Sequence, residues 1–256
     1  MPFLKYKEKN IFYQIKEAEA GKAIVFIHGS GGNSYVWNNQ LAKLNTNYNL
    51  IAIDLPSHDQ SDNFSELSLE LYVDVVNSLV NALKLKDIVL VGHSLGGAVI
   101  QSYYFNYPNE VSALILVGTG ARLRVSPIIL TSLQKDFQEF LKGLPIGAFY
   151  RRTSKELINE YLAETSKTEP QVIYSDFKIC DAFDRMDKMS LINVPCLIIC
   201  GSDDRLTPPK YSTYFHENLK TSELIIIKKA SHMVMLEKPE EMNQAIELFI
   251  KKYLSI

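Results

Sequence analysis

Short, almost unbroken apolar runs recur along the chain after residue 20 and alternate with longer stretches of mixed polarity. The runs are rich in Val, Ile and Leu, and they cover 23–28, 49–54, 87–92, 112–118, 196–201 and 223–228. Continuous apolar runs of this length indicate strands that are buried on both faces of a parallel sheet. Residues 68–84 instead carry apolar residues at helical spacing, behind Ser68 as an N-cap. The pattern predicts an α/β fold with a mostly parallel, doubly wound sheet.

Two regions depart from this rhythm. Residues 3–7 and 10–16 alternate between apolar and polar side chains, which predicts an antiparallel hairpin at one edge of the sheet. Residues 120–190 contain helical patterns, at 127–144, 155–165 and 176–186, but no run typical of a core strand. We therefore expect a core formed by 1–119 and 191–256, interrupted by a helical cap, or lid, at 120–190.

Composition narrows the classes of function. The 256 residues are 46% hydrophobic, which is enough to form a large buried core. The formal net charge of −2 gives no reason to expect binding to nucleic acid. The apolar runs are far too short to span a bilayer, and the first ten residues lack the apolar stretch of a secretory signal. We expect a cytoplasmic protein without a membrane span, and the sequence leaves its oligomeric state open.

Three cysteines, Cys180, Cys196 and Cys200, make an odd number and do not follow the spacing of metal ligands. The simplest interpretation is buried, reduced thiols. His, Cys and Asp residues elsewhere also lack ligand spacing, so we expect neither a metal nor an organic cofactor.

The strongest functional signal is the sequence Gly92-His93-Ser94-Leu95-Gly96, which fits the pattern G-x-S-x-G. The pattern alone is weak, but here a buried strand precedes it and a helical pattern follows it. In that setting a serine lies on a tight strand-to-helix turn, where its hydroxyl can act as a nucleophile. The Leu95 amide can then donate to an oxyanion. The alternative is a tight turn with a purely structural role.

A second glycine-rich loop, His28-Gly29-Ser30-Gly31-Gly32, follows the strand at 23–28. Glycines allow a backbone to approach a ligand closely, and the Ser30 amide is the candidate for the second oxyanion donor. A phosphate-binding loop is the rival interpretation. It is disfavoured because no Gly-Lys-Ser/Thr follows and G-x-G-x-x-G is not matched.

A nucleophilic serine needs a base, and the chain has five histidines. With a serine on this kind of turn, the chain order is serine, acid, base, and the acid and base follow later strands. His28, His58 and His93 precede Ser94 and are excluded by that order. His216 lies in a helical pattern, so His232, in the loop after the last strand, is the predicted base.

The acid is expected in the loop after the strand at 196–201, where Asp203 and Asp204 both qualify. At this point the chain resembles the α/β-hydrolase superfamily, especially its serine esterases with a helical cap. The resemblance extends over nearly the whole chain and depends on HGSGG, DLPSHDQSD, GHSLGG, GSDDRLTP and SHMVMLEKPEEM in that order. The family's acid loop, G-x-x-D-x-x-x-P, falls on Gly201, Asp204 and Pro208. The resemblance therefore implies Asp204 as the acid.

Within this superfamily a serine at Ser94 implies an acyl-enzyme, with a small carboxylic ester as the default substrate of a carboxylesterase-like hydrolase. The same residues would serve a thioesterase, a lactonase or a carbon–carbon bond hydrolase. A slow hydrolase that acts as a small-molecule receptor is the alternative of a different class.

The stretch DLPSHDQSD, residues 54–62, combines acids, a histidine and serines but precedes the nucleophile. The resembling family places glycines where this chain has Ser57 and Asp59. We expect a scaffold loop with a strained or rearranged turn, because Asp tolerates a left-handed backbone better than Ser does.

Overall fold

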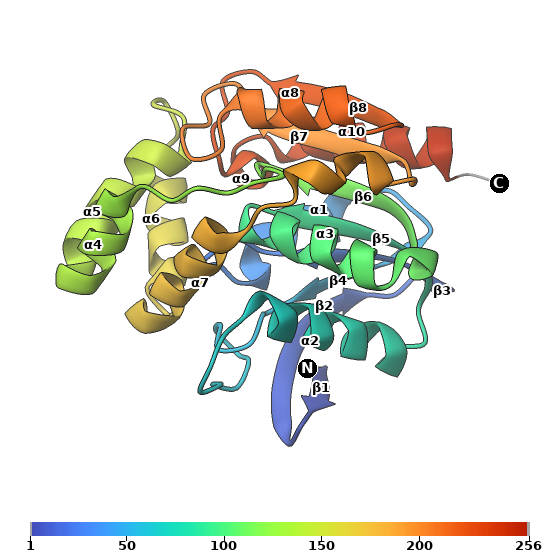
Figure 1. Cartoon of the computed structure of the whole chain (residues 1–256), viewed down its shortest axis with the longest axis horizontal. Coiled ribbons are helices and arrows are strands. Elements are labelled where there is room, and N and C mark those ends of the chain that lie inside the picture. The colour runs from blue at the N-terminus through green and yellow to red at the C-terminus, as the bar shows by residue number, and fades with distance from the viewer. Residues whose placement is uncertain (1, 255–256) are drawn as a thin grey trace.

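One sheet of eight strands forms the centre of the computed structural model, which describes residues 2–254 (Figure 1). The strand order is β1-β2-β4-β3-β5-β6-β7-β8. The strands are β1 (Phe3–Tyr6), β2 (Lys9–Lys16), β3 (Glu19–Ile27), β4 (Tyr48–Ile53), β5 (Lys86–His93), β6 (Val111–Val117), β7 (Cys196–Gly201) and β8 (Ser222–Ile227). β1, β2 and β4 pair antiparallel, whereas β4, β3 and β5 to β8 are parallel neighbours. The predicted parallel sheet with an antiparallel hairpin at one edge is confirmed.

Helices cover both faces of this sheet. They are α1 (Asn38–Lys43), α2 (Leu69–Ala82), α3 (Leu95–Asn106), α4 (Pro127–Lys135), α5 (Phe137–Ala148), α6 (Lys155–Thr165), α7 (Pro170–Ala182), α8 (Pro209–Asn218), α9 (Val234–Glu237) and α10 (Pro239–Tyr253). Short 3-10 turns lie at Ser34–Trp37, Pro108–Glu110 and Met186–Leu191.

Two apolar clusters lie on opposite faces of the sheet because successive side chains of a strand point to opposite sides. In β3, Val25 and Ile27 belong to the cluster that includes residues of α2, α3 and α8, whereas Ile24 and Phe26 belong to the cluster that includes residues of α1 and α10. All four side chains are inaccessible to solvent. A strand that is covered on both sides needs an unbroken apolar run, which explains the sequence pattern.

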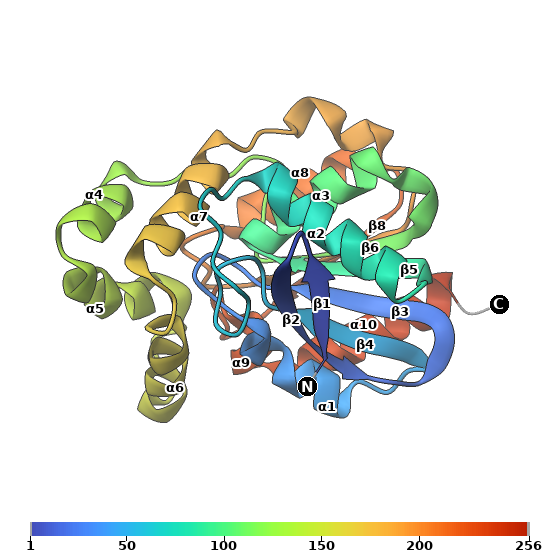
Figure 2. The same cartoon turned by 90° about the horizontal axis from the view of Figure 1, so that it is seen from below.

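Helices α4 to α7 lie together beside the sheet, at the left of both views (Figures 1 and 2). The sequence pattern suggested one helix through 127–144, but the chain breaks at Asp136. The Asp136 carboxylate accepts the Glu139 amide (3.0 Å) and caps α5. Treating 120–190 as a separate cap remains a prediction.

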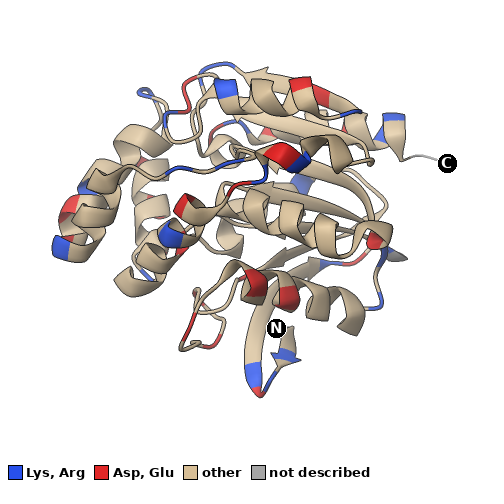
Figure 3. Ribbon diagram, viewed as in Figure 1, with Lys and Arg blue, Asp and Glu red and all other residues tan. Residues whose placement is uncertain are grey.

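The loops that follow β3, β4, β5, β7 and β8 leave the carboxyl ends of the strands, where ligands of open α/β sheets bind. Acidic and basic residues are interspersed over the described elements (Figure 3). Among residues 2–254, no helix combines the length and apolarity needed to cross a bilayer.

Candidate active site

Ser94 lies at the junction of β5 and α3 with φ 52° and ψ −114°, a backbone conformation that few residues other than glycine adopt. Its amide donates to Val117 O (3.1 Å), and its carbonyl accepts the Thr119 hydroxyl (2.8 Å). These bonds hold a turn that costs of order 1–3 kcal/mol in backbone strain.

The glycines that flank Ser94 are required by close backbone approach. A Cβ on Gly92 would lie 2.3 Å from Gly96 O, and a Cβ on Gly96 would lie 2.3 Å from Ile27 O. Any larger residue would push α3 away from β5 or from the end of β3. The two glycines of the G-x-S-x-G pattern thus bring the start of α3 close to the strands.

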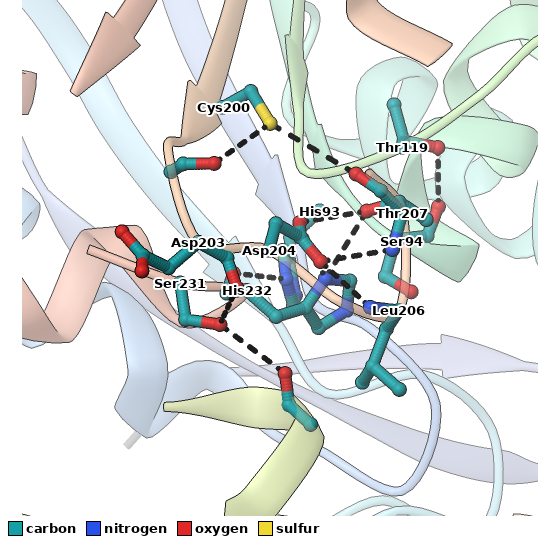
Figure 4. Close-up of polar contacts among 12 residues, drawn as sticks. His93, Ser94, Thr119, Cys200, Asp203, Asp204, Leu206, Thr207, Ser231 and His232 are labelled. Atoms are coloured by element: carbon teal, nitrogen blue, oxygen red, sulfur yellow. Dashed lines mark hydrogen bonds and ion pairs between the residues drawn. The ribbon is translucent and has the colours of Figure 1, made fainter. Parts of the chain in front are cut away.

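His232 and Asp204 meet across the loops that follow β8 and β7 (Figure 4). His232 Nδ1 lies 3.0 Å from Asp204 Oδ2, and both residues are buried. Three further donors reach the Asp204 carboxylate: the amides of Leu206 (2.9 Å) and Thr207 (2.8 Å) and the Thr207 hydroxyl (2.8 Å). Burial alone would raise the pKa of Asp204, but the neighbouring His232 and these hydrogen bonds outweigh burial and lower it.

A carboxylate only accepts hydrogen bonds, so Nδ1 of His232 carries a proton. No hydrogen bond to Nε2 of His232 is found within residues 2–254, and the ring lines the same cavity as Ser94. Asp203 lies elsewhere: its carboxylate accepts the Ser202 hydroxyl (2.6 Å) and is exposed (Figure 4). The structure brings Asp204, and not Asp203, to His232.

The two predicted oxyanion donors belong to segments that converge on Ser94. Leu95 is the first residue of α3. The loop of Ser30 approaches from the other side, since a Cβ on Gly29 would lie 3.0 Å from Ser94 Cβ. Ser30 and Ser94 line one cavity.

That cavity has a volume of about 200 Å³ and mostly apolar walls. The helical segment contributes Leu123, Val125, Ile129, Leu144, Tyr161 and Phe177 to them. Two arginines, Arg124 and Arg205, also line it, and both are exposed. Arg124 is itself 3.5 Å from the Asp184 carboxylate. The cavity is smaller than the ~300–1,000 Å³ of typical sites for drug-sized ligands.

Two of the histidines predicted to be non-catalytic, His93 and His28, hold the backbone around the site. His93 Nε2 donates to the carbonyl of His232 (3.0 Å). His28 Nε2 accepts the Leu55 amide (3.0 Å) while Nδ1 donates to Gly29 O (2.8 Å). His216 is exposed on α8.

The stretch 54–62 contributes no residue to the lining of the cavity. Ser57 and Asp59 have φ values of 69° and 39°, so both positions where the family has glycine are left-handed, as expected for a strained turn. His58 is fully buried and pairs with Asp176 of α7, Nε2 to Oδ2 at 2.9 Å. Asp176 could not be identified from the sequence, because nothing near it in the chain forms a motif.

The segment 147–153 is bound to the loop that carries His232. Glu237 accepts the amides of Tyr150 (2.7 Å) and Ser231 (2.6 Å) and also contacts the Thr153 hydroxyl. The Met233 amide donates to Ala148 O (3.0 Å). The end of α5 is therefore fixed beside the candidate base.

Metal ligands are not clustered in the described part of the chain: no group of three or more His, Cys, Asp or Glu residues there has the geometry to hold an ion. The three cysteines are free and buried, and burial raises the pKa of each thiol to about 12. They are too weakly ionised to act as nucleophiles.

Comparison with known proteins gives a consistent result. Residues 24–245 match the model of the alpha/beta hydrolase family. A pimeloyl-[acyl-carrier protein] methyl ester esterase of Neisseria meningitidis serogroup A is 28% identical, over 92% of this chain and 79% of its own length. A solved thermophilic esterase is 38% identical with a TM-score of 0.87, covering 99% of this chain and 98% of its own. An esterase from Exiguobacterium antarcticum shares the fold at 20% identity, with a TM-score of 0.91 and coverage of 97% and 98%.

Proposed function

The chain belongs to the α/β-hydrolase family, and from that premise we propose that it is a serine hydrolase that cleaves a small carboxylic ester through an acyl-enzyme. Relatives and solved structures named as esterases support a hydrolase that acts on esters. One observation carries the proposal: Ser94 and His232 line the same apolar cavity, while Asp204 holds Nδ1 of His232 from behind.

In the proposed reaction, Ser94 Oγ attacks the ester carbonyl while Nε2 of His232 takes its proton. Asp204 remains ionised and stabilises the resulting imidazolium. The amides of Ser30 and Leu95 donate to the oxyanion of the tetrahedral intermediate. The alcohol leaves with the proton from His232. Water, deprotonated by His232, then attacks the acyl-enzyme and frees Ser94.

We further propose that residues 120–190 act as a cap over this site and that 1–119 and 191–256 form the core. The cavity wall supports this division, because residues of 120–190 line the same cavity as Ser94. A small chamber of apolar and aromatic walls suits a short acyl or alkoxy group. Buried free cysteines favour a reducing compartment, so the proposal includes a cytoplasmic location.

A panel of p-nitrophenyl esters from acetate to octanoate tests the proposal, with acyl thioesters and lactones assayed alongside. We expect a burst of p-nitrophenol equal to the enzyme concentration, followed by steady turnover, and neither in Ser94→Ala. Turnover of thioesters or lactones without turnover of esters would move the activity to those classes. No turnover of any of these would favour a carbon–carbon bond hydrolase or a receptor.

A further inference from the structure

One face of α7 presses against the loop that carries Ser30. Asp176 Oδ2 accepts the Gly31 amide (2.9 Å), and Cys180 Sγ lies 3.6 Å from Ser30 Oγ. Ile173 packs so closely that a Cβ on Gly31, whose φ is +65°, would lie 2.8 Å from Ile173 Cγ1. Residues 173, 176 and 180 are buried and share one helical face. α7 therefore contacts this loop at three points.

Asp176 lies within hydrogen-bond distance of three groups that can donate to a carboxylate. Its carboxylate is inaccessible to solvent and faces three donors: the Gly31 amide, Nε2 of His58 (2.9 Å) and the Tyr72 hydroxyl (2.6 Å). A lone buried charge is strongly unfavourable, so a counter-ion is required.

His58 supplies that counter-ion. Nδ1 lies 3.0 Å from the Pro56 carbonyl and so carries a proton, while Nε2 lies 2.9 Å from Asp176 and donates to it when the ring is an imidazolium. Burial opposes this charge, but Asp176 outweighs burial and raises the pKa of His58. His58 has no free nitrogen and does not line the cavity, so it is not a second base.

The direction of the Ser30 amide follows from the bonds on either side of it. The peptide that joins Gly29 to Ser30 has its carbonyl, Gly29 O, bound to the Gly32 amide (3.0 Å) and to His28 Nδ1 (2.8 Å). In a trans peptide the N–H points opposite to the C=O, so the Ser30 N–H faces away from that turn. The next peptide is held by Gly31 N–H on Asp176.

We infer that Asp176, kept ionised by His58, is a positioning residue that holds the Ser30 amide where the oxyanion forms. The inference rests on the proposed function. On this inference α7 does more than close the cavity. Through Gly31 it holds one of the two oxyanion donors that take part in acyl transfer.

The test compares Asp176→Ala, Asp176→Asn and Lys178→Ala with the unmodified protein. Lys178 is an exposed residue of the same helix and serves as the matched control. Active sites are first counted with a fluorophosphonate, so that kcat refers to folded, reactive enzyme only. We expect Asp176→Ala to lower kcat on a p-nitrophenyl ester about 10- to 100-fold with little change in KM, since a donor is displaced and not deleted. Asp176→Asn keeps an acceptor for the Gly31 amide, so its kcat should lie between those of Asp176→Ala and the unmodified protein.

Hydrogen exchange at residues 30–32 supplies a readout that does not need activity. Both Asp176 variants should exchange these amides faster than the unmodified chain, and Lys178→Ala should not. A lower count of active sites with unchanged kcat per site would reduce Asp176 to a fold-stabilising residue and overturn the inference. Unchanged exchange at 30–32 would do the same. An unmodified protein that turns over no ester would instead defeat the proposed function. If Asp176→Ala does not fold, Asp176→Asn alone decides.

Discussion

Two buried histidine–aspartate pairs lie at the same end of the sheet, and they differ in what the second ring nitrogen contacts. In the pair His232–Asp204, Nδ1 binds the acid and the ring lines the cavity beside Ser94. In the pair His58–Asp176, both nitrogens are bound to acceptors, and neither residue lines the cavity. The distances to the acids are nearly equal, 3.0 Å and 2.9 Å.

The comparison teaches that the contact with a carboxylate does not make a histidine a base. A base needs a ring nitrogen that is free of other hydrogen bonds. Among residues 2–254 no bond to Nε2 of His232 is found, whereas both nitrogens of His58 are occupied. The second pair is instead a buried ion pair between two segments of the chain. The predictions below separate the two pairs, beginning with the largest expected effect.

Removing each histidine should separate the pairs most strongly. His232→Ala should lower kcat by about 10,000-fold, because Ser94 loses its proton acceptor. His58→Ala should lower kcat by no more than about 100-fold, through the Ser30 loop, and so retain activity that His232→Ala abolishes. The measurement is p-nitrophenyl ester turnover per titrated active site. Equal losses in both variants would remove the distinction.

The two neighbouring aspartates give the next contrast. Asp204→Asn should reduce kcat by about 1,000- to 10,000-fold, because an amide cannot stabilise the imidazolium of His232. Asp203→Asn, at an exposed side chain bound to Ser202, should leave most of the activity. The same turnover assay reports both variants, and the reverse outcome would reassign the acid to Asp203.

For stability the order should be reversed: loss of His58 should destabilise the protein more than loss of His232. His58→Ala leaves the Asp176 carboxylate buried without its counter-ion and should lower the free energy of unfolding by about 3 kcal/mol. His232→Ala should cost only about 1 kcal/mol, because Asp204 keeps its bonds from Leu206 and Thr207. Urea unfolding followed by circular dichroism measures both. A larger loss in His232→Ala would contradict the assignment of His58 to an ion pair.

The pairs should also act in opposite pH ranges. The folded-state pKa of His58 is raised, so its contribution to stability is complete below the ordinary value of 6.5 and is lost as the pH rises through the folded pKa. The folded-state pKa of Asp204 is lowered, so its contribution is complete above 3.8 and is lost as the pH falls through the folded pKa. Urea midpoints from pH 3 to 9 measure both limbs, and His58→Gln should flatten the alkaline one.

Four other titratable groups surround His58 and belong in that experiment. Asp176 comes from α7, Tyr72 from α2, His28 from the end of β3 and Asp54 from the loop of His58 itself. Burial lowers the pKa of His28 and raises that of Tyr72, so neither group titrates in the pH range of the His58 limb. Burial raises the pKa of Asp54 to about 6, so Asp54 titrates below the His58 limb. An alkaline limb that persists in His58→Gln would assign it to another group.

The smallest effect is expected in the backbone of the loop 54–62. Asp59 has φ 39°, and Asp59→Gly should raise the free energy of unfolding by about 0.5 kcal/mol, since glycine adopts positive φ without strain. Ser57→Gly is the matched comparison. It relieves a similar strain but loses the Ser57 hydroxyl, which accepts the Phe64 amide (2.9 Å), and should gain less. Destabilisation by Asp59→Gly would show that the side chain matters more than the turn.

The parts of the fold that follow from local patterns could be predicted from the sequence. Runs such as 49–54 become buried strands because both faces of the sheet are covered, and Ser68 caps α2 through the Leu71 amide. The break between α4 and α5 was missed, although Asp136 followed by Glu139 is a capping pattern. Apolar spacing continues through Asp136 on both sides and hides the boundary.

The candidate site divides in the same way. Ser94, Asp204 and His232 each follow a strand within a short motif: the G-x-S-x-G pattern indicated Ser94, chain order indicated His232, and the family resemblance was needed to choose Asp204 over Asp203. The pair His58–Asp176 could not be predicted, because 118 residues separate its members and Asp176 lies in an ordinary helical pattern. Thr207 was missed too: a threonine beside an acid is common, and its bond to Asp204 depends on how the loop folds back.

The contacts that hold the helical segment 120–190 in place are unevenly distributed along it. The end of α5 is fixed to the His232 loop through Glu237, and α7 is fixed to the Ser30 loop through Asp176. α4 and the first turns of α5 instead pack on α7, through Leu133, Phe140 and Ile173. Under the proposed function, substitutions in α4, whose Ile129 lines the cavity, can change which molecules enter while Ser94, Asp204 and His232 keep their places. Substrate range could then change without a change in reaction geometry.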